Sequence, residues 1–364
     1  MGLTVRPLIV DLGRDYRGGQ HQALLLLQGL RARGHALELI AVRDSLLARR
    51  AKDAGIPVQG VAPWCRRIAA ALQIQRIVGS GGADLVQANE PHALTSAWFA
   101  RAHRSVPLIA ARRIAHSLSS SSFSLARYRA ASRIVAISRF VERSVVQSGL
   151  PASSCMVIYD GVEIPAHASL ADRAKARSQF GISRDVLCIG NVAAFVPEKG
   201  HAILIRAFAK LRAQFPGCIL LLSGDGAGRT KAEELVQQLQ LVDAVKFAGP
   251  ATEISTVLAA VDVFAFPSHE EPLGSALLAA MAHALPVVAI ARGGIPEVIE
   301  NEKNGLLVNS LDPSVLSAAL ARLLANPDQA LRFGESARET IVERFSAGEM
   351  ADATLRLYEQ LIAK

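Results

Sequence analysis

Short apolar runs alternate with segments of helical spacing along the chain, and this alternation limits the possible folds more than any other feature. The runs read PLIVDL, ALELIAV, DLVQA, PLIAA and RIVAI in the first half, then VLCIGNVAAF, CILLLSGDG, VKFAG, DVFAFPS, LPVVAI and GLLV in the second. Each run is typical of a buried strand. Because strands that alternate with helices form a parallel sheet covered on both faces, the sequence predicts an α/β fold.

The alternation breaks near Asp160, where YDGVEIPAHASL is rich in turn residues. A chain of 364 residues is also longer than one hydrophobic core usually organises. We therefore expect two doubly wound, Rossmann-like domains, residues 1–165 and 166–345, and a final helix over 346–364 that packs back across the domains. Open sheets of this kind bind ligands beyond the carboxyl ends of their strands, so we expect the domains to face a central cleft.

Charge is distributed unevenly between the two halves. Residues 1–160 carry 21 Lys+Arg against 9 Asp+Glu, a net charge of +12, whereas residues 161–364 carry 19 against 23, a net charge of −4. A half this basic favours anionic partners such as acidic lipid head groups or phosphorylated acceptors. We expect no nucleic-acid partner, because no recognised nucleic-acid module is present. The alternative is a general bias towards arginine.

Cysteine usage and hydropathy predict the compartment. Cys65, Cys155, Cys188 and Cys218 lie far apart and form no metal-binding motif, so we expect free, buried thiols in a reducing environment. The first residues, MGLTVRPLIVDL, fit a first strand better than a signal peptide, and no window reaches the roughly 18 apolar residues of a membrane span. The expectation is a cytoplasmic protein, with peripheral attachment to the inner face of the cytoplasmic membrane.

Three loops that follow predicted strands carry residues suited to binding. Gly18 and Gly19 allow a tight turn at the start of a helix, whose free N–H groups suit an anion or sugar hydroxyls. Lys199 precedes a helix N-terminus, where a cation is poorly placed unless it shares a phosphate with the helix. Asp225 and Gly226 follow another strand. A plain turn, or for Lys199 a solvated surface position, is the structural alternative at each.

A pair of acids, Glu270 and Glu271, follows the run DVFAFPS and precedes the apolar segment PLGSALLAAMAHALPVV. Either the acids form a charged first turn on a buried helix, or they lie at the carboxyl end of the sheet and bind a polar substrate.

The second half of the chain resembles the retaining, nucleotide-sugar-dependent glycosyltransferases of the GT-B fold, specifically family 4. The resemblance rests on EKGHAILIRAF, LLLSGDG, VKFAGP, VDVFAFPSHEEPLGSALLAAMAHALPVVA, GGIPEVI and NGLLV, over residues 185–345. The first half is similar more loosely, through RGGQ, LRARGH and AISRFVERSVVQSGLPASSCMVIYDGVE. The resemblance implies a cytoplasmic enzyme that transfers a sugar to a lipid-linked or glycan acceptor and needs no metal or cofactor beyond the nucleotide-sugar co-substrate.

The resemblance also implies roles for particular residues. Glu271 corresponds to the acid that contacts the transferred sugar, and Lys199 to the lysine that meets the diphosphate. The backbone of Leu273, Gly274 and Ser275 is expected to hold the diphosphate, with Gly18 and Gly19 near the donor phosphate or the acceptor. A wider set of candidates comprises Glu270, Asp225, Gly226, Arg112, Arg113 and His116.

Three positions depart from the family pattern. Ala279 stands where the family has a second acid that grips the nucleotide ribose, and Asn191 stands where it has an arginine. A histidine common in the family is replaced near Arg112 and Arg113. Two hypotheses therefore follow: an active transferase that works on a lipid, lipopolysaccharide or polysaccharide precursor of the cell envelope, or a degenerate relative that binds a glycan, nucleotide or partner without turnover. The sequence names neither the sugar, the base, the acceptor nor the oligomeric state.

Overall fold

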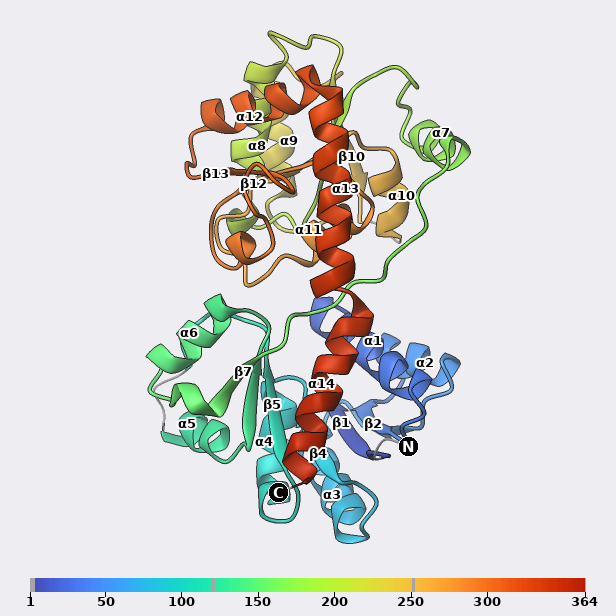
Figure 1. Ribbon diagram of the computed structural model, residues 1–364, viewed down its shortest axis with the longest axis vertical. Helices are drawn as coiled ribbons and strands as arrows, with labels where there is room; N and C mark the ends of the chain where they lie inside the picture. The colour runs from blue at the N-terminus through green and yellow to red at the C-terminus, as the bar shows by residue number, and fades with distance from the viewer. Residues whose placement is uncertain (1–3, 119–121, 251–252, 364) are drawn as a thin grey trace. The chain divides into compact units, whose positions relative to one another are not determined.

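The computed structural model describes residues 4–118, 122–250 and 253–363, and these divide into two compact units (Figure 1). The N-terminal unit comprises Met1–Gly161 and Ala347–Lys364, and the C-terminal unit comprises Val162–Ser346. The division follows the hydrophobic core, because each unit buries its own apolar residues around its own sheet.

The N-terminal unit is built on a seven-stranded parallel sheet with the order β3-β2-β1-β4-β5-β6-β7. Its strands are β1 (Pro7–Asp11), β2 (Glu38–Val42), β3 (Val58–Val61), β4 (Leu85–Ala88), β5 (Leu108–Arg112), β6 (Arg133–Ala136) and β7 (Cys155–Val157). Its helices are α1 (Gly18–Ala32), α2 (Leu46–Asp53), α3 (Arg66–Gly79), α4 (Pro91–Phe99), α5 (Ser122–Arg129), α6 (Arg139–Gln147) and α14 (Ala347–Ile362).

Two apolar layers cover the two faces of this sheet. On one face, Ile9 and Leu39 pack with α1, α2 and α14. On the other, Val10 and Val86 pack with α3 and α4. Adjacent residues of β1 enter opposite layers because side chains alternate along a strand.

The C-terminal unit is built on a six-stranded parallel sheet with the order β10-β9-β8-β11-β12-β13. Its strands are β8 (Cys188–Val192), β9 (Ile219–Ser223), β10 (Val245–Gly249), β11 (Val263–Phe266), β12 (Val287–Ile290) and β13 (Leu306–Val308). Its helices are α7 (Leu170–Gln179), α8 (His201–Leu211), α9 (Arg229–Gln238), α10 (Ile254–Ala259), α11 (Ser275–Ala282), α12 (Pro313–Ala325) and α13 (Pro327–Arg344).

Strand order reverses once in each sheet, and this positions the loops of interest. The reversal lies between β1 and β4 in the first sheet and between β8 and β11 in the second. At such a point the loops after the two strands diverge and leave a crevice beyond their carboxyl ends. Gly18 and Gly19 follow β1, Lys199 follows β8, and Glu271 follows β11.

Helix α14 returns to the N-terminal unit and packs against α1 (Figure 1). A Cβ at Gly29 would lie 2.7 Å from the Cβ of Ala351, so the two helices approach more closely than a larger residue would allow. Tyr358 is fully buried, and its Oη donates a hydrogen bond of 2.7 Å to Oε1 of Gln87. At the surface, Arg33 pairs with Asp352 at 2.6 Å.

All four cysteines are free thiols, which the sequence predicted. Cys188 and Cys218 are buried, but Cys65 and Cys155 are partly exposed, which corrects the expectation that all four are buried. None of the helices in the described part of the chain is long and apolar enough to span a membrane.

Candidate active site

Lys199 and Glu271 meet at the switch point of the second sheet. Nζ of Lys199 lies 2.5 Å from Oε2 of Glu271. The side chain of Glu271 is 10% exposed and that of Lys199 is 26% exposed, so the pair lies at the boundary between core and solvent. An acid and a base 72 positions apart in the sequence therefore share one polar site.

Tight contact between two loops brings the pair together. Gly200 adopts a left-handed conformation with φ of 69°, and a Cβ there would lie 2.3 Å from the carbonyl oxygen of Pro267. The backbone N–H of His269 donates to the carbonyl of Glu198 at 3.0 Å. The loop after β8 is thus fixed to the loop after β11, and only glycine fits at their closest approach.

A third loop, after β12, supports the backbone of Glu271. The N–H of Gly294 donates to the carbonyl of Glu271 at 2.9 Å. At Gly293, with φ of 62°, a Cβ would lie 2.1 Å from that same carbonyl oxygen. Neither glycine was expected at the site from the sequence. The consecutive glycines of GGIPEV were the available signal, since such pairs often mark a close backbone approach.

Helix α11 begins beside this acid. Gly274 is its N-cap with φ of 103°, Ser275 is its first residue, and Leu273 is buried. The first turn contains no acidic residue. Glu270 and Glu271 therefore lie ahead of the helix, which rules out the alternative of a charged first turn. Glu270 itself is exposed, whereas Glu271 is buried.

Two of the three departures from the family pattern lie in this unit, and both are buried. Ala279, on α11, is 6% exposed. Asn191 is fully buried, and its Nδ2 donates to the carbonyl of Ala265 at 2.9 Å. Its Oδ1 has no hydrogen-bond partner among the described residues. Asn191 therefore links β8 to β11 and presents no cation to a ligand.

Asp225 and Gly226 form a turn that packs against the loop after β8. The N–H of Gly226 donates to Oδ1 of Asp225 at 2.8 Å, and the N–H of Phe195 donates to the carbonyl of Asp225 at 2.9 Å. These bonds show that both residues stabilise a turn, which is the structural alternative that the sequence offered for them.

His201, at the start of α8, was missed in the sequence. Its ring stacks on Phe195 with centroids 4.1 Å apart, and its Nε2 has no hydrogen-bond partner in the described part of the chain. Burial, with a smaller contribution from Lys199, lowers the pKa of His201 to about 4. The imidazole is therefore neutral at pH 7.

A second polar cluster lies at the switch point of the first sheet. Asp11, fully buried at the end of β1, accepts hydrogen bonds from Gln20 Nε2 at 3.1 Å and from Asn89 Nδ2 at 2.5 Å. Nδ2 of Asn89 also donates to the carbonyl of Gly19 at 3.1 Å. This network fixes the start of α1. A Cβ at Gly18 would meet nothing within 4 Å, so open space lies beside this glycine.

Arg113 belongs to this cluster and Arg112 does not. Arg113 donates to Asn89 Oδ1 at 2.6 Å and pairs with Asp160 at 3.1 Å. Burial raises the pKa of Asp160, and Arg113 opposes that rise. Arg112 is buried and donates to the carbonyl of His116. Neither arginine is an exposed surface residue, which was the alternative to phosphate binding, and His116 is exposed.

Glu90, after β4, completes the cluster and was also missed. It accepts hydrogen bonds from the backbone N–H groups of Leu12, His92 and Ala93. Burial, with a contribution from Asp11, raises the pKa of Glu90 to about 7. Among the described residues, no group of three or more His, Cys, Asp or Glu side chains is arranged to hold a metal ion.

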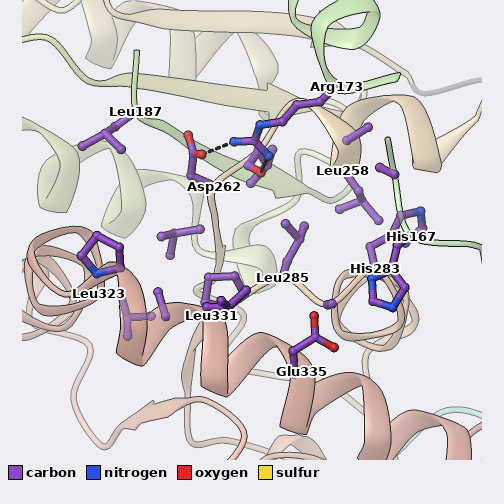
Figure 2. Close-up of a pocket in the computed structure, with 18 of the residues that line it drawn as sticks. His167, Arg173, Leu187, Leu258, Asp262, His283, Leu285, Leu323, Leu331 and Glu335 are labelled. Carbon is purple, nitrogen blue, oxygen red and sulfur yellow. Dashed lines mark hydrogen bonds and ion pairs between the residues drawn. The ribbon is translucent and has the colours of Figure 1, made fainter. Parts of the chain in front are cut away.

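The C-terminal unit also contains a pocket of about 360 Å³ at the opposite edge of its sheet (Figure 2). Leu187, Val263 and Pro286 in its wall lie at the amino ends of β8, β11 and β12. Figure 2 shows the ion pair of Arg173 with Asp262 in the wall. Because parallel sheets bind substrates at the carboxyl ends of their strands, Lys199 and Glu271 form the candidate active site and this pocket does not.

Comparison with known proteins agrees with this geometry. The model for "Glycosyl transferases group 1" matches residues 172–340, and the model for "Glycosyltransferase Family 4" matches residues 16–164. HepE of Anabaena, crystallised with UDP and glucose, superimposes with a TM-score of 0.83 at 24% identity, covering 98% of this chain and 100% of that chain. Two doubly wound parallel sheets of this kind define the GT-B class.

Within that class, the two matches together show that the chain belongs to the family 4 glycosyltransferases. Among curated relatives, a D-inositol 3-phosphate glycosyltransferase of Corynebacterium jeikeium is 33% identical over 226 residues, 58% of this chain and 54% of that protein. The lipopolysaccharide core biosynthesis glycosyltransferase LpsE of Rhizobium meliloti is 34% identical over 181 residues, 50% of this chain and 52% of that protein. The chain thus spans about half the length of these curated relatives. The predictions of an α/β GT-B fold and of family 4 are confirmed.

Proposed function

We propose that this protein is a retaining, metal-independent glycosyltransferase that moves a sugar from a nucleotide-diphosphate donor to a lipid, lipopolysaccharide or polysaccharide precursor of the cell envelope. The observation that carries the proposal is the Lys199–Glu271 pair at the switch point of the second sheet, 2.5 Å apart and next to the N-terminus of α11.

Departure of the nucleoside diphosphate is the step that needs positive charge. As the glycosidic bond breaks, negative charge develops on the phosphate oxygens, and fixed cations or helix N-termini stabilise it. Lys199 supplies an ammonium, and the first N–H groups of α11 supply the positive end of a helix dipole. With a donor bound, Lys199 is expected to exchange its contact with Glu271 for a phosphate oxygen.

The sugar develops positive charge in the same step, because the transition state resembles an oxocarbenium ion. Glu271 is held by three loops and is positioned to accept hydrogen bonds from sugar hydroxyls and to favour that charge. Retention of configuration and independence from metal follow from the family resemblance and are part of the proposal.

Donor and acceptor are proposed from the relatives and from charge. UDP in the HepE crystals and UDP-glucose in a further HepE structure support a nucleotide-sugar donor. Relatives named for inositol 3-phosphate and for lipopolysaccharide core biosynthesis support an anionic or lipid-linked acceptor. The net charge of +12 over residues 1–160, from 21 Lys+Arg and 9 Asp+Glu, suits such an acceptor and the anionic inner face of the cytoplasmic membrane.

A degenerate protein that binds without turnover is the second candidate. Ala279 and Asn191 favour it, since neither the expected acid nor the expected arginine is present and both positions are buried. Loss of a ribose contact costs at most a few kcal/mol of donor binding, so we favour the enzyme.

The test measures turnover with a panel of nucleotide sugars. Release of the nucleoside diphosphate gives the rate, and NMR of the product identifies its anomer. Lys199→Ala and Glu271→Ala should each lower kcat/KM at least about 100-fold, because each removes a charge that stabilises the transition state. The matched controls are Lys303→Ala and Glu300→Ala, an exposed pair 2.9 Å apart in the same unit, which should leave turnover unchanged. Absence of turnover with every donor, or full activity in both site variants, would refute the proposal.

A further inference from the structure

An apolar groove on the N-terminal unit lies between α3, α4 and α5. Its lining includes Ile68, Leu72, Phe99 and Phe123, and its volume is about 520 Å³. Figure 1 shows α3 and α4 on the same side of the first sheet, and the two helices pack together. This is the face that carries the Val10 and Val86 layer.

Large apolar side chains are exposed along the groove and in the adjoining cavity, which Trp64 lines. The exposed fractions are 86% for Trp64, 70% for Ile68, 62% for Leu72, 59% for Phe99 and 46% for Phe123. Ile68 and Leu72 are four residues apart on α3 and therefore share one helix face. Single exposed apolar residues are ordinary on a protein surface, whereas a contiguous group of this size marks an interaction site.

Positive charge surrounds the groove. Arg67 lines it, and Arg66 and Arg67 line an adjoining cavity with Trp64, Ile68 and His92. Arg127 of α5 lies over the ring of Phe123, 4.7 Å from its centroid, and donates to Thr95 of α4. Burial lowers the pKa of His92, and the positive charges of Arg66, Arg67 and Arg127 lower it further. All three arginines therefore lie close to His92.

Acidic residues are missing from the segments that form this surface. Residues 54–83, which include α3, contain three arginines and no Asp or Glu. Residues 91–141, which include α4 and α5, contain eight arginines and no Asp or Glu. The segments that form the surface therefore contribute apolar side chains and arginines, and they contribute no acidic side chain. A protein partner of mixed charge matches this combination poorly, whereas an anionic lipid surface offers both an apolar interior and negative head groups.

We propose that the α3–α4–α5 groove is the membrane-docking surface of this protein, with Trp64, Ile68, Leu72, Phe99 and Phe123 inserting between lipids while Arg66, Arg67 and Arg127 contact anionic head groups. The proposal rests on the proposed function, since it identifies the surface that brings the enzyme to a lipid-linked acceptor. The net charge indicated only that the basic N-terminal half contacts the membrane. The groove narrows that contact to one face of the N-terminal unit.

The experiment measures vesicle binding and needs no donor or acceptor. Trp64 and Trp98 are the two tryptophans of the chain, so a Trp98→Phe background leaves Trp64 as the only fluorophore of its kind. Vesicles of phosphatidylglycerol and phosphatidylcholine should shift the emission of Trp64 to shorter wavelength, and lipids brominated on the acyl chain should quench it. Pure phosphatidylcholine vesicles should bind at least about ten-fold more weakly, because each arginine near an anionic surface contributes roughly five-fold.

Two double variants separate the apolar part of the surface from its charge. Ile68→Ser with Leu72→Ser should weaken binding at least about ten-fold and abolish quenching by brominated chains. Arg66→Gln with Arg67→Gln should weaken binding about 25-fold at low salt and less at high salt. Circular dichroism checks that each variant is folded.

Matched controls place the same changes elsewhere. Leu170→Ser with Val242→Ser removes side chains that are 88% and 61% exposed in the C-terminal unit. Arg49→Gln with Lys52→Gln removes charge from α2, on the other face of the first sheet. Both controls should bind vesicles as the parent does. Absence of binding, an equal loss in the controls, or binding with unquenched Trp64 would overturn the docking surface. The proposed function would be unaffected, because its own test follows turnover of nucleotide sugars and does not depend on vesicle binding.

Discussion

Glycine is used differently in the loops at the two switch points. In the C-terminal unit, Gly200 and Gly293 have positive φ, and a Cβ at either would lie within 2.3 Å of a carbonyl oxygen. In the N-terminal unit, Gly18 meets nothing within 4 Å and Gly19 meets only Arg113 at 3.8 Å. Gly200 and Gly293 hold together the loops that carry Lys199 and Glu271. Gly18 and Gly19 leave open space at the start of α1. This difference indicates a rigid loop arrangement around Lys199 and Glu271 and an open one at the start of α1.

Replacing these glycines by alanine should give the largest difference in stability between the two units. Gly293→Ala should destabilise the C-terminal unit by at least about 3 kcal/mol and abolish turnover, because the added methyl collides with the backbone of Glu271. Gly18→Ala should change stability by less than about 1 kcal/mol, since its surroundings are open. Urea denaturation followed by circular dichroism measures both. A tolerated Gly293→Ala would show that the close approach is not required.

Acid should weaken the C-terminal unit through His201. The folded pKa of about 4 lies below the usual 6.5, so the unfolded chain binds a proton between these pH values while the folded unit does not. Stability is therefore full above pH 6.5 and falls by about 3 kcal/mol as the pH drops to about 4. His201→Leu should remove this contribution to the pH dependence. Both tryptophans lie in the N-terminal unit, so circular dichroism should detect the change while tryptophan emission does not.

Restoring an acid at position 279 tests whether the donor side is complete. Ala279→Glu should strengthen donor binding about ten-fold if a nucleotide ribose lies beside α11, which corresponds to about 1.4 kcal/mol. Ala279→Gln is the matched control, because it adds the same bulk at this buried position without the carboxylate. Titration calorimetry with nucleoside diphosphates measures the affinity. Unchanged or weaker binding in Ala279→Glu would mean that the ribose is held elsewhere.

Loss of one buried hydrogen bond in the N-terminal unit should have the smallest effect. Tyr358→Phe leaves Oε1 of Gln87 without its donor and should destabilise the N-terminal unit by about 1 kcal/mol. Tryptophan emission during denaturation reports on this unit. A stability equal to that of the parent would indicate that water replaces the hydroxyl.

The sequence predicted most of the strands because their apolar runs are buried on both faces. It missed β3 and β7, which lie at the two edges of the first sheet. β3 reads VQGV, which has polar and glycine positions between its valines. β7 reads CMV, which is apolar but only three residues long and partly buried, so neither resembles a central strand. The domain interruption near Asp160 was visible because turn residues replace the alternating pattern.

The candidate site was predictable residue by residue but not as a geometry. Lys199 and Glu271 follow strands, and the sequence indicated both. Their separation of 2.5 Å depends on the contacts that Gly200 and Gly293 make with other loops, which only the folded chain displays. Asn89 and Asp160 were missed because their partner, Arg113, is distant in the sequence.

Helix α14 imposes an order on the biogenesis of this protein. Residues 1–161 leave the ribosome first, yet the layer that contains Ile9, Leu39 and Tyr358 is incomplete until residues 347–362 have been translated. The C-terminal unit is synthesised in between and can close around its own sheet while the earlier unit still lacks a helix. A nascent chain stalled near residue 340 should therefore expose apolar surface on α1 and recruit chaperones, although most of its sequence has already been made.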